Sequence, residues 1–353
     1  MVQGIRGFMG IKIEALRNIK LSEIRRNLSK ECYQRSLFIT FSYLIFDLAW
    51  YVASVAMIFE SNHIVLQLLG CLSAGLATSA LFIWGHDAAH GALFKNQYVA
   101  ELLGTITMLP SFNIYRLWRH GHNRIHHGFT SLTTMDWIWR PWSPKEYFSK
   151  SAFRRWVYRC ERALLTCAVH YFLRVWWEKM IRFKMPKKRV EFILTKSIML
   201  TFIVVYTGLS YYFTRSLWVT LCVVVFPFII FNYMIAFFVY LHHTHPSIPF
   251  FDKREQWSFG LGGIHCSTII RTSRLWEFMT HNILIHTPHH VDFRVPFYRL
   301  KRAYKDLKEH YGDCITEYKF SWVKVIRIFR QCKLYDYESK MWCDFKGVPI
   351  QLN

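Results

Sequence analysis

The stretch LWVTLCVVVFPFIIFNYMIAFFVYLHHTHP, residues 217–246, joins a long apolar run to three histidines. A helix of about 20 apolar residues crosses the hydrocarbon core of a bilayer. Residues 217–241 therefore predict a membrane-spanning helix, and the histidines follow it at once. The stretch predicts a span that ends beside a cluster of imidazoles.

Three further apolar runs are long enough to span a bilayer, and they cover residues 37–59, 64–84 and 192–213. Loops at 60–63 and 214–216 join the four runs in pairs, which predicts two helical hairpins. The chain has 353 residues, of which 52% are hydrophobic, more than is usual in a soluble domain. We expect an all-α integral membrane protein with four transmembrane helices in two hairpins, interfacial helices and a cytoplasmic His-rich metal-binding region.

Positive charge is confined to one side of these predicted spans. The formal net charge is +22, yet the two short loops contain a single basic residue, Arg215. The positive-inside rule then places residues 1–36, 85–191 and 242–353 in the cytoplasm. We expect an integral protein of the cell (inner) membrane with its metal site and both termini in the cytoplasm. No basic module stands apart from the membrane segments, so nucleic acid is excluded as a partner.

Two amphipathic or apolar segments are predicted to lie at the membrane without crossing it. Apolar residues between positions 5 and 28 recur at roughly helical intervals among Lys and Arg, which predicts an interfacial helix. Residues 97–115 are mostly apolar, but they include Glu101 and Pro110. We interpret them as a re-entrant or interfacial helix because a fifth crossing would separate the histidine clusters.

Most of the seventeen histidines fall in four stretches: HDAAH (86–90), HGHNRIHH (120–127), HHTHP (242–246) and HTPHH (286–290). Histidines four residues apart share one face of a helix, so His86 with His90, and His122 with His126, can each point at one metal. All four stretches lie on the predicted cytoplasmic side. The boxes at 86–90, 122–127 and 286–290 together hold eight imidazoles, more than one tetrahedral zinc needs, which implies two metals. Zn, Cu, Fe and Ni all accept imidazole.

The boxes HxxxH, HxxxHH and HxxHH, with two hairpins and a common cytoplasmic face, resemble the integral-membrane fatty acid desaturase and hydroxylase superfamily. Within it, YLHHTHPSIPFF (240–251), HTPHHVDFRVPFY (286–298) and WRHGHNRIHH (118–127) are similar to acyl-lipid desaturases of the Δ12 and ω3 type. The resemblance runs from about residue 80 to about residue 305. We expect residues 1–36 to form a cytoplasmic amphipathic N-terminal segment, residues 37–330 a membrane desaturase domain, and residues 331–353 a C-terminal tail.

The resemblance implies an O₂-dependent desaturase that introduces a cis double bond into an acyl chain of membrane lipid at two non-haem irons. It implies no catalytic residue distinct from the metal ligands. The implied ligands are His86, His90, His122, His126, His127, His286, His289 and His290, with His243 as a ninth and His245 as the second choice for that position. The sequence contains no GxGxxG and no HPGG, so we expect a separate electron donor of the ferredoxin or cytochrome b5 type.

Three aspartates and six other histidines are expected to act near the boxes without binding metal, or to lie apart from them. Asp87, Asp136 and Asp292 lie close to the boxes and are predicted to orient imidazole N–H groups. Hydrogen bonding, not ligation, is expected of His120, His265 and His281. Packing or solvation is expected of His63, His170 and His310.

Three alternatives remain at this stage. The second box has three residues before its histidine pair, where the plant Δ12 pattern has two, so a hydroxylase or ketolase acting on a lipid, an alkane or a carotenoid is the nearest alternative. A bis-His haem membrane protein is the second, although the predicted spans contain no histidine. A transporter is the third, with Asp47 and Lys196 as its intramembrane ionisable groups.

Overall fold

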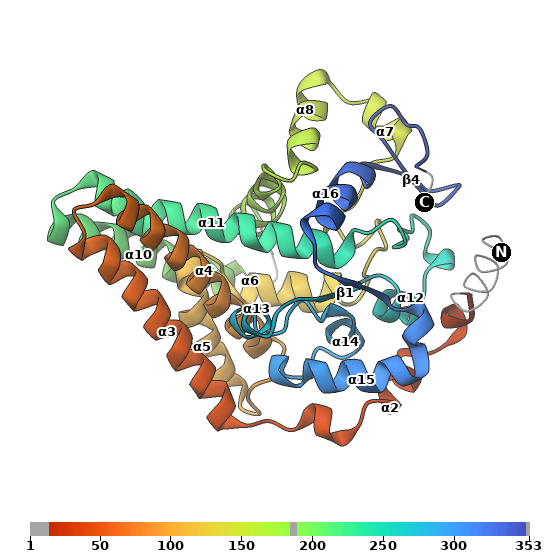
Figure 1. Ribbon diagram of the computed structural model, residues 1–353, viewed down its shortest axis with the longest axis horizontal. Coiled ribbons are helices and arrows are strands. Elements are labelled where there is room, and N and C mark those ends of the chain that lie inside the picture. Colours follow the sequence, from red (N-terminus) through yellow and green to blue (C-terminus); the bar gives the residue numbers. More distant parts are fainter. Residues whose placement is uncertain (1–13, 184–188, 351–353) are drawn as a thin grey trace. The chain divides into compact units, whose positions relative to one another are not determined.

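The computed structural model describes residues 14–183 and 189–350 of the chain (Figure 1). It divides into two compact units, each assembled from segments far apart in the sequence. Unit 1 comprises Met1–Gln34, His122–His170 and Phe237–Asn353, and unit 2 comprises Arg35–Gly121 and Tyr171–Ala236.

Unit 2 is built on long apolar helices. Within the described residues, four helices are long and apolar enough to cross a membrane: Leu37–Glu60 (α3), Ile64–Ala89 (α4), Ile193–Thr214 in α10 (Arg189–Thr214) and Leu217–His243 (α11). Short loops join α3 to α4 and α10 to α11, so the two predicted hairpins are present. The predicted fold class, an all-α membrane protein with four candidate spans, is confirmed.

Two of these helices continue beyond the predicted ends of the spans. Helix α4 runs to Ala89, so that His86 lies in its last turn. His90 caps it, and Gly91 follows with a φ of +67°, which suits the left-handed position after a helix. Helix α11 runs to His243 and stops shortly before Pro246, which disfavours helical backbone in the residue before it. The first and third histidine stretches therefore begin on helices.

The apolar segment after α4 forms short helices, namely α5 (Gln97–Met108), the 3₁₀ turn η2 (Leu109–Ser111) and α6 (Tyr115–Arg119). The 12 residues of α5 rise about 18 Å, well short of the ~30 Å hydrocarbon core. A Cβ atom at Gly85 of α4 would lie 2.7 Å from the hydroxyl oxygen of Thr107. Helix α5 thus packs closely on α4 and is too short for a fifth crossing, as expected of a re-entrant or interfacial helix.

The cation inside the third candidate span has a structural partner. Lys196 donates hydrogen bonds to the carbonyl oxygens of Ile181 and Phe183, at 2.9 and 2.7 Å. Those carbonyls lie at the end of the π-helical segment η4 (Tyr171–Ile181), where backbone acceptors lack helical partners. This arrangement explains Lys196 without the transport role considered above.

Unit 1 is made of short elements around the last turns of α11. Its helices are α2 (Leu21–Arg26), α7 (Pro144–Phe148), α8 (Ala152–Glu161), α9 (Ala168–His170), α12 (Phe259–Ile264), α13 (Arg274–Met279), α14 (His286–Val291), α15 (Leu300–Tyr311) and α16 (Trp322–Gln331). Its 3₁₀ turns are η1 (Lys30–Tyr33), η6 (Arg254–Gln256), η7 (Phe297–Arg299) and η8 (Gly312–Cys314). Another π-helical segment, η3 (His120–His126), leads into unit 1.

Two small sheets complete unit 1, and the sequence analysis did not predict them. Strand β1 (Thr268–Arg271) pairs in parallel with β2 (Thr316–Lys319), with Thr268 opposite Thr316. Strand β3 (Leu334–Asp336) pairs antiparallel with β4 (Met341–Cys343). Strand β1 lies between α12 and α13, and so holds the chain just before the last histidine box.

The N-terminal segment packs on protein where we expected an interfacial helix. Residues 5–13 of that prediction lie outside the described residues. In the described part, Leu16, Ile24 and Leu28 are buried, and Arg25 donates a hydrogen bond of 2.8 Å to the carbonyl oxygen of Val291. The apolar residues of this part therefore face unit 1, because the last histidine box offers them a surface to cover.

Candidate metal centre

The last histidine box forms a single short helix. Helix α14 covers His286–Val291, and Pro288 stands in its first turn, where a missing N–H group costs no helical hydrogen bond. His286, His289 and His290 are all buried. The helical spacing predicted from the sequence is therefore present, and it directs three imidazoles into the interior of unit 1.

Four imidazoles of unit 1 converge on one point. One ring nitrogen from each of His126, His243, His286 and His290 lies within 4.8 Å of the others. The Nε2 atom of His243 lies 3.1 Å from that of His126 and 3.1 Å from that of His286, and the Nε2 atoms of His286 and His290 are 3.0 Å apart. Elements η3, α11 and α14 contribute these side chains, so this quartet is assembled from three separate histidine stretches.

The partners of the outer ring nitrogens fix the tautomers of two members. The Nδ1 atom of His126 lies 3.0 Å from the Oδ2 atom of Asp136, and the Nδ1 atom of His243 lies 3.0 Å from the carbonyl oxygen of Cys266. A carboxylate and a carbonyl oxygen only accept hydrogen bonds, so Nδ1 carries the proton in both rings. The inner Nε2 atoms of His126 and His243 then present lone pairs to each other.

A third member follows the same logic through a hydroxyl group. The Oγ1 atom of Thr130 donates to the carbonyl oxygen of His126 at 2.8 Å, and it lies 3.0 Å from the Nδ1 atom of His290. Since its proton is already engaged, Thr130 accepts from His290, whose Nε2 atom is then also a lone pair. The lone pairs of His126 and His243, on Nε2 atoms 3.1 Å apart, repel each other unless a cation lies between them, and that of His290 lies within 4.8 Å of both. The donor set fits a metal ion with nitrogen ligands.

Burial keeps these rings in the form that binds metals. Burial lowers the pKa of His286 and of His290 well below the ordinary value for histidine, and the neighbouring imidazoles lower it further. Both rings are therefore neutral at physiological pH. A neutral imidazole is the form that coordinates a metal ion.

The second box differs from its predicted geometry. We expected an α-helix that places His122 and His126 on one face, but residues 120–126 form a π-helix, in which hydrogen bonds join residues five apart. The backbone N–H of His127 donates to the carbonyl oxygen of His122 at 3.0 Å, and the Nε2 atoms of these two rings lie 3.1 Å apart. His122 therefore pairs with His127, which leaves His126 to the quartet.

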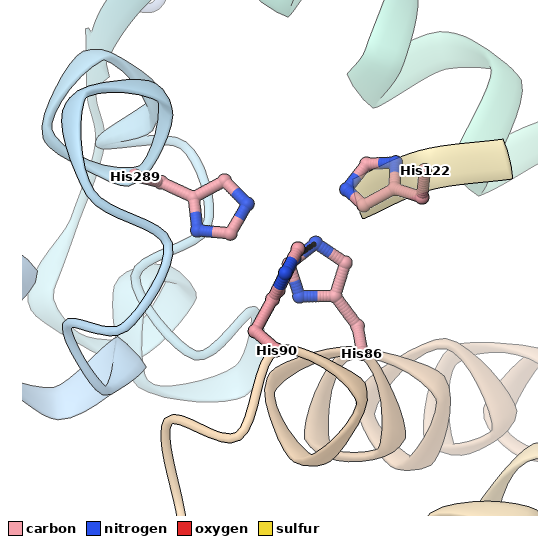
Figure 2. Close-up of side chains that lie close together, drawn as sticks. All are labelled: His86, His90, His122 and His289. Carbon is pink, nitrogen blue, oxygen red and sulfur yellow. Dashed lines mark hydrogen bonds between the residues drawn. The ribbon is translucent and has the colours of Figure 1, made fainter. Parts of the chain in front are cut away.

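The remaining predicted ligands come from both units, and Figure 2 draws four of them, His86, His90, His122 and His289. In unit 2, His86 and His90 project from the end of α4, with Nε2 atoms 3.4 Å apart, and the Nδ1 atom of His86 lies 2.9 Å from Asp87. In unit 1, the ring of His289 lies beside that of His127, with centroids 4.7 Å apart. The carboxylate of Asp87 orients His86 as Asp136 orients His126, so the predictions for these two aspartates are confirmed.

The prediction for Asp292 is wrong. Its carboxylate accepts two hydrogen bonds from Arg294, at 2.9 and 2.6 Å, and one from the hydroxyl of Tyr33 at 2.9 Å. Burial alone would raise the pKa of Asp292, but the hydrogen bonds from Arg294 and the charge of Arg25 hold it below its usual value. The carboxylate is thus occupied by Arg294, Arg25 and Tyr33, and the last two belong to the N-terminal segment, so Asp292 anchors that segment to the end of α14.

Histidines outside the predicted ligand set have other contacts. His245 shares a hydrogen bond of 2.7 Å with Ser247 and stacks on Tyr318, while His265 lies 2.8 Å from the carbonyl oxygen of Cys314. His170 is packed, as expected, and stacks on Trp139 with ring centroids 3.8 Å apart.

Sequence reasoning gave no role to His242, the residue before His243 in the HHTHP stretch. Its buried ring stacks on that of His286, with centroids 3.8 Å apart. The only signal in the sequence was this position beside a candidate ligand. His242 therefore supports a member of the quartet from one side.

The family of the chain follows from comparison with known proteins. The model of the fatty acid desaturase family matches residues 62–322, about three quarters of the chain. The chain belongs to this family. The desaturase is 27% identical over 332 residues to a protein named sn-1 oleoyl-lipid 12-desaturase from Picosynechococcus sp., and the similarity covers 91% of each chain. It is 28% identical to the chloroplastic omega-6 fatty acid desaturase of Arabidopsis thaliana, over 94% of the present chain and 73% of the relative.

These similarities confirm the resemblance to Δ12-type acyl-lipid desaturases. The protein is a fatty acyl desaturase, an oxidoreductase of lipid metabolism that is associated with a membrane. Its histidine groups can hold metal ions.

Proposed function

We propose that this desaturase holds two iron ions through the nine histidines predicted from the sequence. The quartet of His126, His243, His286 and His290 would hold one iron. To the second iron we assign the other five histidines of the sequence-based prediction, His86, His90, His122, His127 and His289. The proposal rests above all on the three lone pairs that converge in the quartet, and membership of the desaturase family favours iron over the other metals that imidazole accepts.

We further propose that the substrate is an acyl chain carried on membrane lipid and that a cis double bond is introduced at the Δ12 position. The names of the cyanobacterial and chloroplast relatives support this choice. An iron pair, when bound, would supply the chemistry that uses O₂, two electrons and two protons to remove two hydrogens from adjacent carbons, with two molecules of water as the other product. The residues of the chain hold the metals, while Asp87 and Asp136 keep the Nδ1 protons in place.

The test is expression in a bacterial host, followed by mass spectrometry of fatty acid methyl esters with localisation of the double bond. We expect a new double bond at Δ12, and a hydroxylated product would contradict the proposal. Purified protein should contain about two irons per chain, because nine imidazoles can give each metal four or five ligands. Haem absorbance, or stoichiometric zinc in an active preparation, would exclude the iron pair.

We propose a cytoplasmic metal centre in the cell (inner) membrane and a separate acidic electron donor, either a ferredoxin or a cytochrome b5. The basic segments around the spans favour both. Desaturation by the purified enzyme should therefore require an added reduced donor. Activity without one would contradict that part.

The orientation of the protein in the membrane is tested with one exposed position in a short loop and one in a basic segment. A membrane-impermeant maleimide on intact cells should label Asn62→Cys in the short loop before α4. It should label Met135→Cys only after the membrane is opened. Labelling of position 135 in intact cells would place the histidine boxes outside.

A further inference from the structure

Helix α16 (Trp322–Gln331) has three kinds of surface where a helix on a soluble protein has two. Its buried side chains are Val325, Ile328 and Phe329. Its exposed apolar side chains are Trp322, Val323 and Ile326, which are 59%, 70% and 38% exposed. Its exposed basic side chains are Lys324, Arg327 and Arg330.

These side chains are sorted by angle around the helix, with Arg330 as the exception. At about 100° per residue, the buried residues fall on one side and the exposed apolar residues span the next ~100°. Lys324 and Arg327 follow beyond them, while Arg330 lies at the angle of the apolar sector but in the last turn of the helix. The buried sector is satisfied by the protein, and the basic sector suits water or anions. Neither the protein nor water accounts for the exposed apolar sector. Contiguous exposed apolar surface of this kind marks a contact with a partner or a membrane.

The position of α16 identifies what covers this sector. Phe329 stacks on Phe237 with ring centroids 6.3 Å apart, and Trp322 lies 6.1 Å from the same ring. Phe237 belongs to the last two turns of α11, the most apolar candidate span (Figure 1). Next to it, Phe238 contacts Trp276 of α13, and the neighbouring Leu275 is 68% exposed. Exposed apolar side chains thus gather where a spanning helix leaves the membrane.

The arrangement matches that of an interfacial helix. Such helices place an apolar face at the boundary between headgroups and acyl chains and a basic face on anionic headgroups. In addition, α16 begins at residue 322, where the match to the desaturase family ends, so that match does not describe it.

We infer that α16 rests on the surface of an anionic bilayer, with Trp322, Val323 and Ile326 among the acyl chains and its basic residues on phosphate groups. The inference needs a membrane protein but does not depend on the metal or on the position of the double bond. It assigns to α16 a contact with lipid beside Phe237, near the end of α11.

The test places a nitroxide spin label at Val323→Cys and, as the matched control, at Lys324→Cys in the basic sector. Of the native cysteines in the described residues, all but Cys160 are buried, so both variants carry Cys160→Ser. The full-length protein is studied in nanodiscs of phosphatidylcholine, with and without phosphatidylglycerol. Depth is measured from the relative access of oxygen and of a water-soluble nickel complex.

The label at position 323 should lie roughly 5–10 Å below the headgroup boundary, and the label at 324 should remain in water. Phosphatidylglycerol should increase the depth of the label at position 323. In that variant, glutamine at positions 324, 327 and 330 should abolish this increase. Equal access of nickel to both labels would overturn the inference. So would protection of position 323 that arises only when an acidic electron donor is added, since the face would then bind protein.

Discussion

Replacing His243 with alanine is expected to abolish the formation of double bonds, whereas replacing His245 with alanine should leave most of it. The two residues stand two positions apart in the same HHTHP stretch, but only His243 belongs to the quartet. Its Nε2 atom lies 3.1 Å from two other members, while His245 is engaged with Ser247 and Tyr318. Loss of His243 opens a coordination position, and we expect activity to fall by at least ~100-fold.

The measurement is the amount of Δ12 product per amount of protein in the membrane, together with the iron content of each purified variant. Normalising to protein is required because loss of a metal can also destabilise a fold. The His243→Ala protein should contain less than the wild-type content of iron, and the His245→Ala protein should match the wild type. If His243→Ala reached wild-type levels and retained its activity, the quartet would not be a metal site.

Spacing in the sequence was enough to predict which histidines lie together on α14. His286, His289 and His290 are neighbours through local helical geometry alone, and Pro288 is compatible with that helix. The structural reason for preferring His243 to His245 is the point at which α11 ends. The helix directs His243 into unit 1 and stops before His245. The ends of spans are therefore as informative as their apolar centres.

The π-helix of the second box was beyond sequence reasoning. An HxxxHH pattern is compatible with an α-helix, which pairs His122 with His126. The structure pairs His122 with His127 and sends His126 toward His243 of another helix. That choice depends on contacts across 117 residues of sequence, which no local pattern contains.

Proximity in the sequence also failed to distinguish the three aspartates. Asp87 and Asp292 are one and two residues from a predicted ligand, whereas Asp136 is nine residues from His127. Yet Asp136 contacts an imidazole and Asp292 does not, because Arg294 and Tyr33 reach the latter first. A carboxylate near a histidine box is thus only a candidate until its cationic neighbours are known.

The Asp136→Asn variant is expected to lose about 10–100-fold in iron affinity and activity, as is typical when a group that orients a metal ligand is changed. The Oδ2 atom of Asp136 accepts from the Nδ1 atom of His126 at 3.0 Å and from the backbone N–H of Ser131 at 3.2 Å. An asparagine keeps the size of the side chain but loses the negative charge.

The matched control is Asp292→Asn, which removes a buried carboxylate that binds arginine and tyrosine instead of an imidazole. Iron affinity is measured by competition with a chelator, and stability by thermal unfolding. Asp136→Asn should shift the affinity, whereas Asp292→Asn should mainly lower the unfolding temperature, because it weakens the anchor of the N-terminal segment. Equal affinities in the two variants would show that Asp136 does not act through His126.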